Sequence, residues 1–199
     1  MSWIRPLGNT GLNVSALGLG TVKLGRDQGV KYPTGFTIPD DREAGKLLSQ
    51  AKSLGINLID TAPAYGNSEE RLGTLLKDQR KDWLICSKVG EEFVQGHSSF
   101  DFSPEHVTFS IERSLKRLKC DVIDMVLVHS DGNDLDIIHR LGTLQALQQL
   151  KQRGLIRAHG VSTKTIAGGL AAAAEADLVM LTYNLAQQDE KPVLDECAR

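Results

Sequence analysis

Residues 55–66 read Gly55-Ile-Asn-Leu-Ile-Asp60-Thr-Ala-Pro-Ala-Tyr65-Gly66, and this stretch decides the fold. A short run rich in isoleucine and leucine follows a glycine and ends at the ionisable Asp60. Such a run predicts a strand buried on both faces, as in a parallel sheet. The loop that follows contains proline and carries Tyr65. The stretch therefore predicts a buried strand with polar side chains just beyond its carboxyl end.

Five further apolar runs of the same kind flank this stretch, at residues 16–21, 83–88, 125–129, 158–162 and 178–183. Amphipathic segments lie between them and predict helices over residues 40–54, 68–76, 103–118, 141–150 and 168–176, with a last helix running from about residue 189 to the end. Strands that alternate with helices predict an α/β fold with a parallel sheet. Residues 1–14 differ, because a turn at Gly8–Gly11 between two short extended runs predicts a β-hairpin that could cap the bottom of a barrel.

Local signals place several helix starts and one loop. Asp40 or Asp41, Ser68 and Ser103, the last followed by proline, are each a residue type that caps a helix amino terminus. Within the first helix, an inward stripe is predicted from Ala44, Leu47, Leu48, Ala51 and Leu54. Residues 22–39 are rich in polar residues and glycine and predict a long loop.

The predicted strands end in polar or ionisable residues. Asp60, Lys88 and His129 end three of them, and Tyr65 follows Asp60 by five residues. Taken singly, each residue has an ordinary structural explanation. Asp60 could cap a turn, and Lys88 could be a solvated surface side chain. His129 could be a structural histidine, and Tyr65 could be an aromatic residue at the edge of the barrel mouth. In an α/β barrel, however, the loops at the carboxyl ends of the strands converge on the active site, so the four side chains are expected to meet there.

These four residue types also suit one kind of reaction, the protonation of an oxygen that is gaining negative charge. A tyrosine is a poor proton donor near neutral pH because its pKa is ~10. A lysine cation nearby favours the phenolate and lowers that pKa, while a carboxylate holds the lysine charged. A histidine can hydrogen-bond the substrate oxygen or help relay the proton. This set suits a hydride acceptor whose oxygen must gain a proton.

Four segments together resemble the aldo-keto reductase family: Gly55–Glu69, Cys86-Ser-Lys88, Ile123–His129 and Gly154–Ser162. The resemblance covers nearly the whole chain, in order and in spacing. It implies a TIM-type (β/α)8 barrel that binds NADPH and reduces the carbonyl of a small-molecule aldehyde or ketone. By resemblance, Tyr65 is the general acid, Lys88 and Asp60 tune it, and His129 orients the carbonyl.

The resemblance also implies a cofactor set. These residues are Gly20, Thr21, Asp60, Ser162, Thr163 and Tyr183. Ser162 matches a residue that hydrogen-bonds the nicotinamide amide, and Thr21 matches a contact near the first strand. Two positions depart from the family pattern: Thr163 stands where asparagine is usual, and Met180 where glutamine often grips the carboxamide. These departures put the cofactor geometry in question, not the fold.

The chain has 199 residues, whereas eight βα units need ~250. We count six units, so residues 1–199 are expected to form a single barrel domain that is incomplete at its C-terminal side. The first and sixth strands would then be edges with unpaired backbone groups, through which the chain could self-associate. We therefore expect the chain to be a fragment, a natural truncation or a piece that another chain completes.

Composition narrows the function classes. The residues are 41% hydrophobic and 24% charged, with a net charge of -2, so no global basic signal points to nucleic acid. The sequence contains neither a signal-peptide pattern nor ~18 consecutive apolar residues, so no membrane association is expected. Three cysteines at no metal-ligand spacing predict reduced thiols in a cytoplasmic protein without a metal site.

Gly18-Leu-Gly20 lacks the third glycine of a dinucleotide-binding Rossmann loop. The remaining competitor is a non-catalytic binding or regulatory protein that keeps the barrel architecture.

Overall fold

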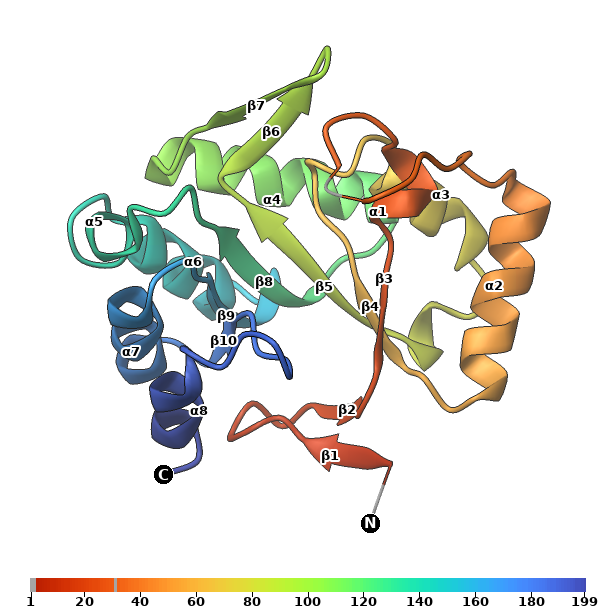
Figure 1. The fold of residues 1–199 in the computed structure, drawn as a ribbon. Helices are drawn as coiled ribbons and strands as arrows, with labels where there is room; N and C mark the ends of the chain where they lie inside the picture. Colours follow the sequence, from red (N-terminus) through yellow and green to blue (C-terminus); the bar gives the residue numbers. More distant parts are fainter. Residues whose placement is uncertain (1–2, 31) are drawn as a thin grey trace.

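The computed structural model describes residues 3–30 and 32–199 (Figure 1). Within this part of the chain, one curled sheet holds six parallel strands whose spatial order is their sequence order: β3 (Gly18–Gly20), β4 (Leu58–Asp60), β5 (Leu84–Val89), β8 (Ile123–His129), β9 (Ile156–Ser162) and β10 (Leu178–Met180). Each strand therefore pairs with the next strand of the sheet along the chain, as in the first six units of a (β/α)8 barrel. The predicted parallel sheet is confirmed.

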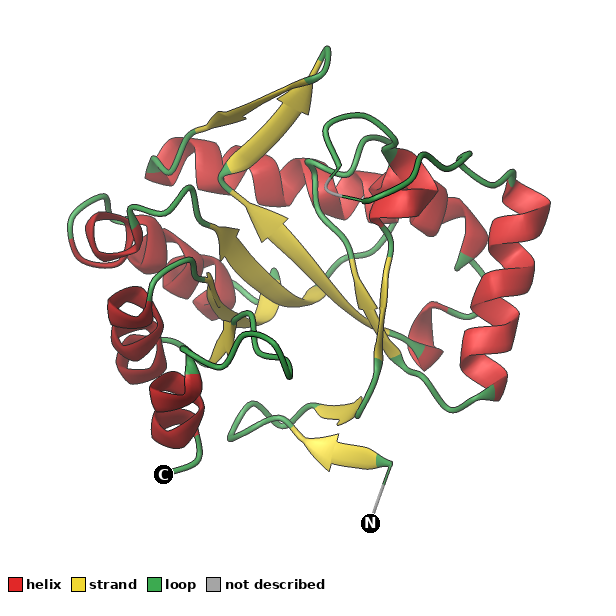
Figure 2. Cartoon of the chain, in the orientation of Figure 1, coloured by secondary structure: helices red, strands yellow, loops and turns green. Residues whose placement is uncertain are grey.

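Helices cover the outer face of the curl (Figure 2). The longer ones are α2 (Asp41–Ser53), α3 (Ser68–Leu75), α4 (Pro104–Leu118), α6 (Thr143–Gln152), α7 (Ile166–Glu175) and α8 (Lys191–Cys197). The main apolar core lies between these helices and the sheet. A second, smaller core lies inside the curl around Met125, Leu127 and Ala158. The central strands β5, β8 and β9 are therefore buried on both faces, which explains why they read as largely apolar runs.

Two of the predicted helix starts are confirmed in atomic detail. Asp40 accepts a hydrogen bond from the backbone N–H of Glu43 at 2.7 Å, and the Glu43 carboxylate accepts one from the backbone N–H of Asp40 at 3.2 Å. Ser103 accepts from the backbone N–H of His106 at 3.3 Å, and Pro104 occupies the first turn of α4. Each cap satisfies amide groups that the first helical turn leaves without an internal partner.

Other local predictions are wrong. Ser68 is the first residue of α3 and not its cap, because its hydroxyl turns inward and donates to Thr21 Oγ1 at 2.9 Å. Leu47 and Leu54, expected on the inward stripe of α2, are exposed. Residues 22–39 are not all loop, since Val22–Gly25 form the short helix α1.

The C-terminal boundaries also differ from the prediction. β10 ends at Met180, and α8 begins at Lys191 and ends at Cys197. Val193 of α8 is fully buried against Gly169 of α7.

Two hairpins lie at opposite ends of the sheet (Figure 1). The first, of β1 (Ile4–Pro6) and β2 (Asn13–Ser15), is the predicted N-terminal hairpin and lies at the amino ends of the strands. The second was not predicted: β6 (Glu91–Val94) and β7 (His97–Phe100) pair antiparallel directly beyond β5. Its turn, Gln95-Gly96, has positive φ at both residues, the geometry of a tight two-residue hairpin turn.

Strands β3 and β10 are the two edges of the sheet in the described chain. The smaller core leaves part of the inside of the curl open, as a cavity of about 350 Å³ lined mainly by apolar side chains, among them Leu58, Met125 and Met180. Unpaired edge strands beside apolar surface are templates for association.

We expect the 199-residue chain, expressed alone, to self-associate through these edges. Sedimentation velocity across a concentration series measures this, and salt should weaken the association little because the buried surface is apolar. A monomer at every concentration would contradict the expectation.

Candidate active site

Lys88 and Asp60 form a buried ion pair at the carboxyl ends of β5 and β4. Lys88 Nζ donates to Asp60 Oδ1 at 2.5 Å and to the backbone carbonyl of Thr61 at 3.0 Å. The Lys88 side chain is only 2% exposed. Burial alone would lower the pKa of Lys88, but the Asp60 carboxylate and the nearby Tyr65 outweigh it and raise the pKa above its ordinary value. Lys88 is thus a buried cation. It is not the solvated surface lysine that was the alternative explanation from the sequence.

Tyr65 is positioned by a close contact between two loops. Gly66 has a φ of +61°, and a Cβ there would lie 2.0 Å from the carbonyl oxygen of Gly25. Arg26 also donates to the carbonyl of Ala64 at 3.1 Å. The loop after β3 is therefore packed against the loop after β4, and a side chain at residue 66 would separate them.

The Tyr65 ring lies between Lys88 and His129. Lys88 Nζ is 5.0 Å from the centroid of the Tyr65 ring. The ring of His129, the last residue of β8, stands edge-on to Tyr65 with the centroids 6.3 Å apart. The structure therefore brings together the four side chains that the sequence singled out.

The pKa of Tyr65 is raised above 10.0, which differs from the balance expected from the sequence. Burial is the largest cause, and the Lys88 cation acts in the expected lowering direction without overcoming it. At neutral pH Tyr65 consequently carries its proton. That is the form a proton donor needs.

Glu91 is a further site residue that the sequence analysis missed. His129 Nδ1 lies 2.6 Å from Glu91 Oε2, an ion-pair distance at which the ring N–H is not aligned as a hydrogen bond. Burial would raise the pKa of Glu91, but the His129 ring, the Ser98 hydroxyl and the Arg26 cation together hold that pKa at about 2. Glu91 is therefore an anion at any physiological pH.

The predicted cofactor residues occupy two kinds of environment. Ser162 ends β9 in register with His129 and is 8% exposed, whereas Gly20 is exposed at the end of β3 and Tyr183 is exposed in the segment that follows β10. Thr163 is 4% exposed, and its Oγ1 is buried without a hydrogen-bond partner in the described structure.

Thr21 differs from the other predicted cofactor residues. Its hydroxyl is buried and donates to the carbonyl of Asp60 at 2.8 Å. The side chain of Thr21 is thus committed to joining β3 and β4, which leaves its hydroxyl turned away from solvent.

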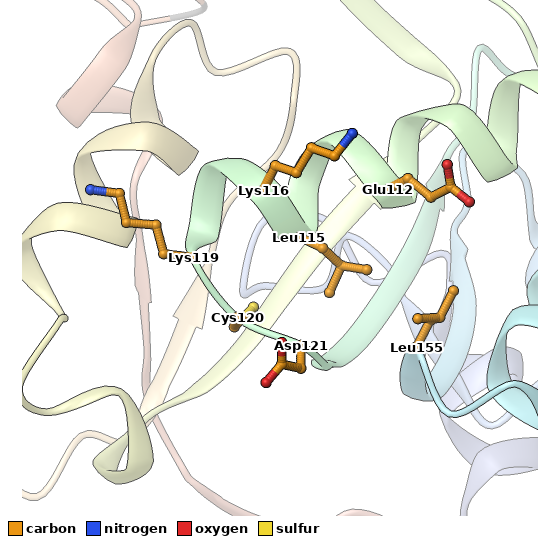
Figure 3. A pocket seen from close by; sticks show the side chains of 7 residues that line it. All are labelled: Glu112, Leu115, Lys116, Lys119, Cys120, Asp121 and Leu155. Atoms are coloured by element: carbon orange, nitrogen blue, oxygen red, sulfur yellow. The ribbon is translucent and has the colours of Figure 1, made fainter.

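Other features of the described chain do not compete for the site. A hollow of about 580 Å³ beside α4 is lined by Leu115, Cys120 and Leu155 among others (Figure 3). It lies at the amino ends of β8 and β9, opposite to Tyr65. Residues 3–30 and 32–199 bring no three histidine, cysteine or acidic side chains together as metal ligands. In the same residues, no helix has the length and apolar character needed to cross a bilayer.

Comparisons with known proteins agree with this geometry. The model of the Aldo/keto reductase family matches residues 16–199. An L-galactose dehydrogenase of Arabidopsis thaliana is 40% identical over 165 residues, which are 80% of this chain and 48% of that protein. An NADH-specific methylglyoxal reductase of Escherichia coli is 32% identical over 170 residues, covering 79% of this chain and 51% of its own length. The chain thus spans about half the length of these curated relatives.

Solved structures give the same result. A protein of Pseudomonas aeruginosa assigned to the aldo-keto reductases superimposes with a TM-score of 0.92 at 60% identity, covering 98% of this chain and 74% of that one. An aldo-keto reductase of Bacillus halodurans, solved in its holo form, has a TM-score of 0.76 at 30% identity, covering 92% and 58%.

Proposed function

This chain belongs to the aldo/keto reductase family, and from that premise we propose that the protein reduces an aldehyde or ketone to an alcohol with NADPH. The single observation that carries the proposal is the cluster of Asp60, Tyr65, Lys88 and His129 at the carboxyl ends of three neighbouring strands. A family member that had lost catalysis would have no need to keep a buried lysine charged beside a protonated tyrosine.

Each side chain has a distinct task in the proposed reaction. Tyr65 donates its proton to the carbonyl oxygen as that oxygen gains negative charge. The Lys88 cation stabilises the phenolate left behind, and Asp60 holds Lys88 in place by the 2.5 Å contact. His129, edge-on to Tyr65, contacts the same oxygen or exchanges the proton. A bound nicotinamide cofactor supplies the hydride.

The end of β9 offers a fitting place for the nicotinamide. Thr163 Oγ1 is a buried polar atom without a partner among the described residues, and such atoms are costly unless a ligand or water satisfies them. Ser162 and Thr163 would hold the carboxamide, and Asp60, Gly20 and Tyr183 belong to the proposed cofactor surface, which the fully buried Thr21 would support from beneath through its bond to the Asp60 carbonyl. Met180, in register with Ser162, offers no comparable hydrogen bond.

Substrate class and cofactor choice are suggested only by similarity. The relatives are named for the oxidation of a sugar, L-galactose, and for the reduction of methylglyoxal, a small dicarbonyl, which favours a small polar carbonyl substrate. One of them is named as NADH-specific, so NADPH is a proposal for this chain. A cytoplasmic location also stays a prediction.

The proposal is tested by carbonyl-dependent cofactor oxidation. We expect the protein to oxidise NADPH when methylglyoxal or an aldose is added and to leave it unchanged otherwise. NADH in place of NADPH, at matched concentration, measures the cofactor preference. Cofactor binding by fluorescence titration without turnover on any aldehyde or ketone would favour the non-catalytic binding protein instead.

A further inference from the structure

We propose that Glu91 is a positioning residue that keeps a proton on Nδ1 of His129, so that Nε2 is the nitrogen that accepts and releases the catalytic proton. The inference rests on the proposed function and chooses between the two roles open to His129. It makes the histidine a proton relay to Tyr65, because a ring nitrogen with a permanent hydrogen can orient an oxygen but cannot take up a proton.

The turn after β5 brings Glu91 to His129. Gly90 has a φ of +100°, and a Cβ there would lie 2.4 Å from the ring of Phe102. The chain therefore bends sharply between Lys88 in β5 and Glu91 in β6, with Phe102 packed against the bend. Two residues three positions apart thus contact two different members of the site: Lys88 contacts Asp60, and Glu91 contacts His129.

The two oxygens of Glu91 have different partners. The Ser98 hydroxyl donates to Oε1 at 2.6 Å, and the Arg26 guanidinium lies 3.7 Å from the same oxygen. Oε2 is the oxygen beside His129 Nδ1. Arg26 is itself held by the ring of Phe93, 3.4 Å from its guanidinium carbon, and by the carbonyl of Ala64. The carboxylate is therefore locked from one side and presents its other oxygen to the histidine.

Because Nδ1 is buried, its contact with Glu91 determines which ring nitrogen of His129 carries the proton. Nδ1 is closed off from solvent, and among the described residues Glu91 is the one acidic side chain within ion-pair distance of it. A carboxylate only accepts hydrogen bonds, so it favours a proton on the nitrogen that faces it. Nε2, on the far side of the ring from Glu91, is then free to gain and lose a proton.

Glu91→Gln separates this role from a simple structural one. Ser98 and Arg26 should keep the amide oxygen at the Oε1 position, so the amide N–H group would face Nδ1. The histidine must then accept at Nδ1 and carry its proton on Nε2, by the same logic that reverses the tautomer in an aspartate-to-asparagine variant of a serine protease triad. We expect the relay to fail and turnover to fall about 10- to 100-fold, with KM little changed because Nε2, which carries the hydrogen in this variant, can hydrogen-bond the substrate carbonyl.

The matched control is Glu92→Gln. Glu92 neighbours Glu91 in β6 but faces α4, where it lies 2.5 Å from Arg113 and 3.3 Å from His106. This variant removes the same charge from the same hairpin without touching His129. Thermal unfolding of both variants shows whether the hairpin stays folded.

A readout independent of activity is nitrogen-15 NMR of the histidine rings, with the His129 signals assigned through His129→Gln. We expect the proton on Nδ1 in the parent protein and on Nε2 in Glu91→Gln. Glu92→Gln should perturb His106 and leave His129 unchanged. If Glu91→Gln leaves the His129 tautomer as it was, the inference is overturned whatever the activity. If the parent protein reduces no carbonyl but the tautomer reverses, the proposed reduction fails while the positioning of His129 by Glu91 stands.

Discussion

Tyr65→Phe is expected to lower the turnover of carbonyl reduction at least ~100-fold, the low end for loss of a general acid. The phenylalanine ring keeps the edge-on contact with His129, whose ring centroid is 6.3 Å away, so the loop should retain its shape. Only the proton that neutralises the forming alkoxide is lost. Cofactor affinity should stay nearly intact, because the residues proposed to hold the nicotinamide lie at the end of β9. Steady-state kinetics with a cofactor titration measures both quantities.

Tyr32→Phe is the matched control for this variant. It removes the same hydroxyl from an exposed tyrosine whose ring packs edge-on against Phe36. Turnover in that variant should match the parent protein. If Tyr65→Phe keeps most of its rate while the parent is active, Tyr65 is not the proton donor.

Lys88→Met is expected to reduce the free energy of unfolding by about 3 kcal/mol, at the low end for breaking a buried ion pair. Lys88 is only 2% exposed, whereas Asp60 is 23% exposed and can recover some hydration when its partner is lost. Lys52→Met is the control, because Lys52 and Asp82 form a pair on the surface with both side chains about half exposed. That change should cost no more than about 1 kcal/mol. Denaturant unfolding compares the two, and equal losses would contradict the burial argument.

The pH dependence of Lys88→Met follows from the direction of two pKa shifts. The pKa of Lys88 in the folded protein is raised above 10.5, so its stabilising contribution is fully present below that pH and declines only as pH rises through the raised value. The stability difference should therefore be constant across neutral pH. The Lys88 cation also lowers the pKa of Tyr65, so its loss raises that pKa further. In the reduction direction the basic limb of the pH–rate profile should move to higher pH, and an unchanged limb with normal turnover would rule out electrostatic tuning by Lys88.

The sequence by itself determined the order of the strands and helices and the members of the central cluster. Buried parallel strands are mostly apolar, so their carboxyl ends are visible where a polar residue such as Asp60 or His129 ends the run. Helix starts such as Ser103-Pro104 are encoded within a few residues, because a cap satisfies backbone groups of its own first turn. Parallel pairing of successive strands then places all their carboxyl ends on one side of the sheet.

Only the tertiary structure decided how these groups act. The raised pKa of Tyr65 depends on how far neighbouring loops bury it, and the hydroxyl of Thr21 is taken up by the Asp60 carbonyl of the next strand. Glu91 reaches His129 because Gly90 bends the chain and an exposed hairpin, whose polar residues show no core periodicity, folds over the strand ends. Burial and the distances between charges arise from segments that are far apart in sequence. The sequence states which ionisable groups are present. Packing determines how far each group is desolvated and which partners lie beside it, and these set its pKa and charge.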